Sequence, residues 1–280
     1  MIEEAWAAQE HQHGVLPLIE TFFEVKGPFA DLTAGRKRGA LGLFTPAPGS
    51  GWGAGAIDGE RVDGGVLLRG GVRLPGTACD GALVLVRLGG TEHRLAWLDL
   101  DTPGVERRGS RSGGSVSEGP YWLHIDGAVV GSDLVSKPVT LDPGGDLVRL
   151  LEAYAGVWAP AAARCARDGV HALRRAARLG GFHTSQVVAL GITEVEIEAD
   201  LTAAAVQRGE GLAVAAAAAR TLSAVAAKTE ELRDVYGLDI ESPLAGAAAK
   251  TLTAFLGGAL LLEDELARAL GIPGAREAHA

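Results

Sequence analysis

The sequence changes character near residue 150, and this change limits what the chain can fold into. Most of its 40 glycines lie between about Gly49 and Gly145, whereas alanine dominates from Leu150 to the end. Glycine marks turns between short strands, and alanine favours helix interiors. The sequence therefore predicts a β-rich part followed by a helical part.

The glycine-rich part contains four short apolar or alternating runs, separated by Gly, Pro and Asp clusters: residues 66–74, 81–88, 93–100 and 121–130. Runs of this length and spacing are typical of strands in a small β-barrel or sandwich.

The alanine-rich part places apolar residues three and four positions apart in four successive segments: residues 147–179, 185–208, 212–238 and 243–270. This periodicity predicts four amphipathic helices of bundle length. Thr184 or Ser185 can cap the second helix, and Pro243 suits the first turn of the fourth. Pro160 is expected to kink or split the first helix near Ala159.

Residues 1–48 contain two short helix-like pieces and are too few to form a domain. The predicted organisation is a reduced N-terminal helical segment (1–48), a β-domain (49–140), a C-terminal helical bundle (141–272) and a tail (273–280). The fold class is α+β, with a small β-barrel or sandwich followed by a four-helix bundle.

Composition excludes several classes of protein. No long apolar stretch is free of charges or helix breakers, so a membrane span is not expected. Two cysteines and an acidic N-terminus without an apolar signal core favour a cytoplasmic protein. A net charge of −9, with no basic stripe, argues against nucleic acid as a partner.

Several catalytic motifs are missing from the sequence. Its 7 histidines include no i, i+4 pair beside a carboxylate, and no C-x-x-C occurs, so no metal site is predicted. His11 and His13 are expected to be exposed. The sequence contains no G-x-S-x-G elbow, and the glycine patterns of P-loop and dinucleotide-binding proteins do not occur.

The last helical segment is unusual because Gly257 and Gly258 interrupt it shortly before Glu263 and Asp264. One interpretation is a helix-to-helix turn followed by a solvated acidic helix start. The other is a backbone approach to a ligand, with a carboxylate beside Leu260–Leu262. Desolvation would make that carboxylate a strong enough base to abstract a proton.

Several short patterns, in order, resemble the acyl-CoA dehydrogenase family over roughly residues 40–270. Residues 45–50, which begin with Thr45, resemble the T-E-P-x-A-G-S loop, and residues 66–72, 98–105 and 123–130 resemble three strands of its β-domain. Arg175 and Gln186 are spaced as in the R-x-x-F-G-x-x-I-x-x-F-Q segment.

The resemblance implies FAD as cofactor, contacted by Thr45, Arg175, Gln186, Gly257 and Gly258. It implies an acyl thioester of CoA or acyl carrier protein as substrate. Glu263, or alternatively Asp264, would then remove the α-proton while a hydride passes from the β-carbon to flavin N5.

The sequence also departs from the family pattern. Pro46 replaces the loop glutamate, residues 74–76 replace W-I-T, Arg178 and Leu179 replace Phe-Gly, and the N-terminal helical domain is reduced to about 45 residues. We therefore expect a homo- or hetero-oligomer in which a second dehydrogenase-like subunit completes the site. The alternative is a flavin-free protein that uses the scaffold for non-redox chemistry or ligand binding in secondary metabolism.

Overall fold

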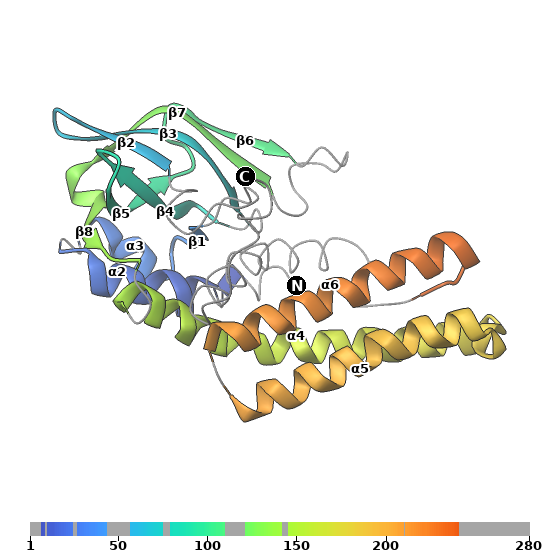
Figure 1. Ribbon diagram of the computed structural model, residues 1–280. Helices are drawn as coiled ribbons and strands as arrows, with labels where there is room; N and C mark the ends of the chain where they lie inside the picture. The colour runs from blue at the N-terminus through green and yellow to red at the C-terminus, as the bar shows by residue number, and fades with distance from the viewer. Residues whose placement is uncertain are drawn as a thin grey trace, which may run out of the picture. The chain divides into compact units, whose positions relative to one another are not determined.

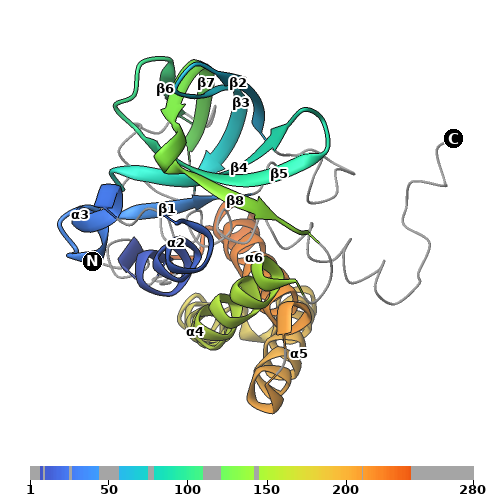
Figure 2. The same cartoon turned by 90° about the vertical axis from the view of Figure 1, so that its left-hand side faces the viewer.

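The computed structural model describes residues 7–8, 10–24, 27–43, 57–74, 79–109, 121–141, 145–209 and 211–240. The described part is α+β and forms two compact units, and the boundary between them lies within a long helix, between Tyr154 and Ala155. Figures 1 and 2 show the helices and strands of each unit. The predicted fourth helix, residues 243–270, lies outside the described residues.

The first unit is built on one eight-stranded mixed sheet with the order β6-β7-β3-β2-β4-β5-β8, in which β1 also pairs with β4. The strands are β1 (Gly39–Gly42), β2 (Ile57–Val62), β3 (Gly65–Leu74), β4 (Gly81–Leu88), β5 (Glu92–Asp99), β6 (Val105–Gly109), β7 (Tyr121–Gly131) and β8 (Val135–Val139). The four runs predicted as strands correspond to β3, β4, β5 and β7.

Two separate strands share one edge of β4. The first half of β4 pairs in parallel with β1, from Gly39 opposite Gly81 to Gly42 opposite Val84. The last three residues of β4 pair in parallel with the start of β2. Seven of the eight β4 residues are buried, as expected for a central strand covered on both faces.

The N-terminal helices belong to the same unit. The π-helical turn η1 (His11–Val15) continues into α2 (Leu16–Phe22), and the 3₁₀ turn η2 (Gly27–Phe29) continues into α3 (Ala30–Thr33). Figure 2 shows α2 beside β1 and β8. Phe29 is fully buried and packs edge-on against Trp97 of β5, with ring centroids 6.4 Å apart. This apolar contact ties the N-terminal segment to the sheet.

The second unit contains most of α4 (Asp146–Leu179), the 3₁₀ turn η4 (Phe182–Thr184), α5 (Gln186–Arg208) and α6 (Gly211–Tyr236). The three helices lie side by side (Figure 1). They match three of the predicted helices, and Ser185 occupies the N-cap position of α5, although its side chain makes no capping hydrogen bond.

The expected split of the first helix at Pro160 is wrong, because α4 continues through this residue. Proline removes the N–H that would bond the carbonyl four residues earlier, here that of Gly156. Both Gly156 and Pro160 are exposed, so water can satisfy that carbonyl and the helix continues.

Candidate functional site

Only part of the predicted site lies in the described residues. Arg175 and Gln186 are described, whereas the other predicted site residues lie outside: the cofactor contacts Thr45, Gly257 and Gly258 and the candidate bases Glu263 and Asp264. The structure therefore places two candidate cofactor contacts and the strand that leads toward Thr45.

Arg175 and Gln186 lie at the same end of the second unit. Arg175 is one turn before the end of α4, and Gln186 is the first residue of α5, after the turn η4. Both side chains are exposed. The preceding arginine, Arg174, is paired with Glu196, but no described residue forms an ion pair with Arg175. A cation and an amide are thus available here to a ligand, and they suit a pyrophosphate and an adenosine respectively.

The edge of β1 that does not pair with β4 is covered by two consecutive polar residues, whose burial the sequence analysis did not predict. The Leu41 N–H donates to Glu10 Oε1 at 2.8 Å, and the Gly39 N–H donates to His11 Nδ1 at 3.1 Å. Residues two apart on a strand direct their N–H groups to the same side. Glu10 and His11 therefore take the place of a neighbouring strand along this edge.

The second ring nitrogen of His11 lies 3.1 Å from the Leu32 carbonyl oxygen. Because Nδ1 accepts from Gly39, Nε2 must carry the proton and donate to Leu32. The expectation that His11 is exposed is wrong, since only 8% of it is accessible. Burial lowers the His11 pKa, with Arg38 adding a smaller repulsion, so the neutral form is favoured.

Glu10 is the most strongly perturbed carboxyl group among the described residues. It is 3% exposed, and burial raises its pKa to about 8, against the opposing effect of the Leu41 hydrogen bond. Burial raises the pKa values of Tyr154, Tyr121 and Cys79, and the charge of Glu10 adds a smaller increase to each. The Tyr121 hydroxyl is 3.4 Å from Cys79 Sγ. We call these residues the Glu10 cluster: Glu10, His11, Cys79, Tyr121 and Tyr154.

The spacing of residues in the sequence indicates which face of the N-terminal helix is buried. Glu10, Gly14, Leu18 and Phe22 follow each other at intervals of four, and all four are buried. The same periodicity places His11 beside Val15. The apolar residues of the face were visible in the sequence, but the carboxyl and imidazole groups on it were not recognised as buried.

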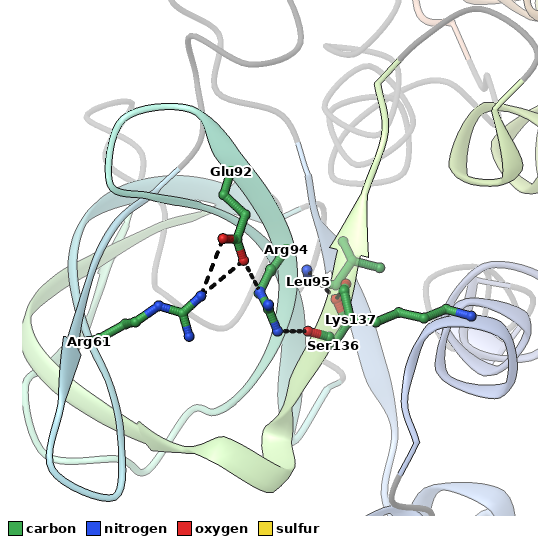
Figure 3. A network of polar contacts seen from close by, with 6 residues as sticks. All are labelled: Arg61, Glu92, Arg94, Leu95, Ser136 and Lys137. Atoms are coloured by element: carbon green, nitrogen blue, oxygen red, sulfur yellow. Dashed lines mark hydrogen bonds and ion pairs between the residues drawn. The ribbon is translucent and has the colours of Figure 1, made fainter.

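A separate groove of about 280 Å³ is lined by residues around the junction of β5 and β8: Glu24, Arg94, Ser132, Asp133, Val135, Ser136, Lys137 and Pro138. Arg94 is fixed in it by Glu92 and by the Ser136 carbonyl, 2.8 Å from Nη1 (Figure 3). Glu92 also accepts from Arg61, and the Ser136 hydroxyl accepts the Leu95 N–H at 2.8 Å. The guanidinium is thus already occupied by the protein's own acceptors.

The described residues contain no group of three or more His, Cys, Asp or Glu side chains able to hold a metal ion. Within the same part of the chain, no helix is both long enough and apolar enough to cross a membrane.

No family model and no curated protein matches the sequence. Solved structures do match its fold. A glutaryl-CoA dehydrogenase from Mycobacterium smegmatis is 18% identical with a TM-score of 0.67, over 96% of this chain and 76% of that one. An acyl-CoA dehydrogenase from Geobacillus kaustophilus is 19% identical with a TM-score of 0.67, over 93% and 77% of the two chains.

A third match is the ChsE4–ChsE5 complex from Mycobacterium tuberculosis, which is 17% identical with a TM-score of 0.57, over 95% of this chain and 73% of that chain. A structure of a glutaryl-CoA dehydrogenase from Mycobacterium smegmatis in complex with FADH2 is 15% identical with a TM-score of 0.60, over 90% of this chain and 71% of that chain. These likenesses show that the chain has the fold of the acyl-CoA dehydrogenases.

Proposed function

We propose that this chain is an acyl-CoA dehydrogenase-like subunit of a flavin-dependent enzyme that introduces an α,β double bond into an acyl thioester. The observation that carries the proposal is the extent of the fold match, since the likeness to glutaryl-CoA dehydrogenase covers 96% of the chain. Fold alone does not fix function. The ordered motifs at residues 45–50, 66–72, 98–105 and 123–130 add independent support.

We propose FAD as the cofactor, because the two described candidate contacts suit it chemically. Exposed Arg175 is free to pair with a pyrophosphate, and exposed Gln186 is free to hydrogen-bond an adenosine. The Thr45 loop and Gly257-Gly258 complete the proposed contacts. FAD, when bound, would accept the hydride released from the substrate β-carbon.

The remaining chemistry is assigned to Glu263, with Asp264 as the alternative. Either carboxylate follows the apolar residues 260–262, and an apolar environment raises the pKa of a carboxyl group. A carboxylate with a raised pKa is well suited to remove the α-proton of an acyl thioester and hold it.

We propose that a second subunit completes the active site. At the position of the W-I-T motif this chain has Leu74, which is fully buried at the end of β3 and whose side chain has no polar atom to offer a flavin. At the position of the motif glycine it has Leu179, which is 82% exposed. The ChsE4–ChsE5 structure is a complex of two differently named chains, which is consistent with a divided site.

The finer parts of the architecture are proposals of the same kind. Residues 243–270 would form the fourth helix of the C-terminal bundle, and the mixed sheet would close as a small barrel or sandwich. The substrate would be carried by CoA or by acyl carrier protein, in the cytoplasm.

Buried Leu74 also favours a second candidate function. If the lost flavin contacts are not supplied by a partner, the scaffold is left for non-redox chemistry or ligand binding without flavin, as in secondary metabolism. The two functions differ in one measurable property, which is whether flavin co-purifies with the protein.

The test is to purify the chain alone and together with a co-expressed neighbouring dehydrogenase subunit, and to record visible spectra. A flavin band in the co-purified sample, or in the chain alone after FAD is added, supports the dehydrogenase. Glu263→Gln should then abolish thioester oxidation while the flavin band remains, with Asp264→Asn as the matched variant. If neither sample takes up FAD, the dehydrogenase proposal fails and the flavin-free function is favoured.

A further inference from the structure

The sheet of the first unit carries a tryptophan between two arginines on neighbouring strands. Trp122 of β7 lies opposite Arg73 of β3 on one side and opposite Arg108 of β6 on the other. In the sheet β7 lies between β3 and β6 (Figure 1). Directly opposite residues point to the same face of a sheet, with Cβ atoms about 5 Å apart. We call these three residues the Trp122 row: Arg73, Trp122 and Arg108.

The Trp122 row faces away from the apolar core of the sheet. Its neighbours along the strands belong to that core: Leu74 follows Arg73, and Tyr121 and Leu123 flank Trp122. Because side chains alternate between the two faces of a strand, the row lies on the opposite face. Trp122 is accordingly 39% exposed. Its indole is therefore accessible to a ligand.

Arg73 is the partly buried cation of the row and has no counter-charge. No residue in the described ranges forms an ion pair with it, and burial is what lowers its pKa. A cation withdrawn from water is costly unless an anion pairs with it. Arg108, in contrast, is paired with Glu106 at 2.7 Å and is more exposed. Arg73 is thus the group of the row that an incoming anion would stabilise.

The next residue of β3 on this face is a glycine, which leaves space beside the indole. Gly71 lies opposite His124, which follows Trp122 on the same face of β7. A Cβ added to Gly71 would lie 3.9 Å from Cε3 of the Trp122 ring, and its nearest neighbour would be the Leu123 carbonyl oxygen at 3.4 Å. Both are ordinary van der Waals distances. An atom of a ligand fits here and touches the indole.

We propose that the Trp122 row binds a nucleoside phosphate, with the base stacked on Trp122 and a phosphate paired with Arg73. Nucleobases stack on aromatic side chains, and a guanidinium offers two parallel N–H donors to phosphate oxygens. The row spans two strand spacings, about 10 Å. This is the size of a nucleotide and is too small for a protein interface. The row shares no residue with the proposed FAD contacts, so the proposal does not rest on the proposed function.

The first test titrates the full chain with ADP by calorimetry in phosphate-free buffer. Trp122→Leu should raise the dissociation constant of ADP roughly 5- to 100-fold, the range measured for losing one base–aromatic stack. Trp122→Phe keeps a ring and should restore most of the affinity. Arg73→Gln should weaken ADP binding but leave the binding of adenosine, which has no phosphate, unchanged.

Arg69→Gln is the matched control. Arg69 is another arginine of β3 on the same face, but it lies opposite Asp126 and pairs with Glu60 at 3.5 Å. This variant should keep the wild-type affinity for ADP. A wild-type chain that does not bind ADP, or equal ADP affinity in wild type and Trp122→Leu, would overturn the proposal.

FAD itself contains an ADP group, so Arg175→Ala is titrated in parallel. Binding at the Trp122 row predicts wild-type ADP affinity in this variant. Loss of ADP binding in Arg175→Ala with no loss in Trp122→Leu would place ADP at the proposed flavin contact and overturn the proposal. Titration with CoA identifies the source of the nucleotide. Tighter binding of CoA than of ADP, weakened by Trp122→Leu, assigns the nucleotide part of CoA, whereas equal or tighter binding of ADP assigns a free nucleotide.

Discussion

At the scale of single residues, the most informative group is the Glu10 carboxyl, which occupies the position beside β1 where a neighbouring strand would normally pair. Glu10 accepts the Leu41 N–H from the free edge of β1, and the chain continues from this strand directly toward Thr45. A buried N–H must be paired, but an ionised carboxylate is costly to bury. The protonated acid satisfies both needs, because its carbonyl oxygen still accepts the bond.

We predict that Glu10→Gln stabilises the protein at alkaline pH. The folded-state pKa of Glu10 is raised to about 8 from its ordinary 4.5, so stability is lost as the pH rises from about 4.5 through 8. Glutamine keeps the acceptor for Leu41 but cannot ionise. The variant should gain a few kcal/mol over wild type at pH 8–9 and nothing near pH 4.5, measured by urea unfolding.

His11→Gln is the matched control, because its pH dependence has the opposite sign. The pKa of His11 is lowered by burial, so wild type loses stability as the pH falls below about 6.5, where the unfolded chain begins to bind the proton. Glutamine removes this loss at acid pH. If the stability difference between wild type and Glu10→Gln is the same at pH 5 and pH 9, Glu10 does not titrate in the folded protein as described.

At the scale of elements, the sequence predicted the strands that carry an apolar pattern and missed those that do not. β4 reads as a continuous apolar run and was found, whereas β2 has one buried residue and β6 includes Glu106, Arg107 and Arg108. β2 is held by pairing with β3 and with residues 86–88 of β4. Such long-range pairing leaves no local periodicity, so tertiary contacts decide these strands.

The candidate site divides in the same way. Arg175 and Gln186 were selected from a spacing pattern, and the structure leaves both exposed at one end of the helical unit. Glu10 and His11 were missed because helical polar residues near a terminus usually face solvent. Their burial depends on β1 having no second strand neighbour among the described residues, which is a property of the assembled sheet.

Helix α4 yields a prediction about an exposed glycine in its interior. A Cβ added to Gly156 meets no atom within 4 Å, and its backbone is helical. Alanine loses less backbone entropy than glycine on forming a helix. We predict that Gly156→Ala raises the free energy of unfolding by about 0.5–1 kcal/mol, measured by thermal and urea unfolding.

Gly65→Ala provides the contrasting substitution in the sheet. A Cβ at this position would lie 2.1 Å from the Val130 carbonyl oxygen of β7, so the paired strands would have to separate. This variant should be destabilised by more than about 1 kcal/mol. If the two substitutions changed the free energy of unfolding equally, the space around each glycine would not determine the effect of adding a methyl group there.

At the scale of the whole molecule, the fold match covers a larger share of this chain than of the glutaryl-CoA dehydrogenase chain. It covers 96% of this chain and 76% of the glutaryl-CoA dehydrogenase chain. The proposal that another subunit completes the site is supported by buried Leu74 and exposed Leu179. Binding of FAD should then be measurable in the chain alone only as a weak effect and should become stronger in the complex.

This leads to a prediction about FAD as a stabilising ligand. A ligand that binds only the folded state raises its stability by about 2.7 kcal/mol at 100 times its dissociation constant. In the co-purified complex, FAD should raise the melting temperature, and Arg175→Ala should weaken FAD binding roughly 10- to 100-fold, as expected for one charge-assisted bond. Arg164→Ala changes another exposed arginine of α4, away from the proposed pyrophosphate contact, and should have no effect. Equal loss in both variants would show that only the general positive charge of α4 matters, and the specific role of Arg175 would be rejected.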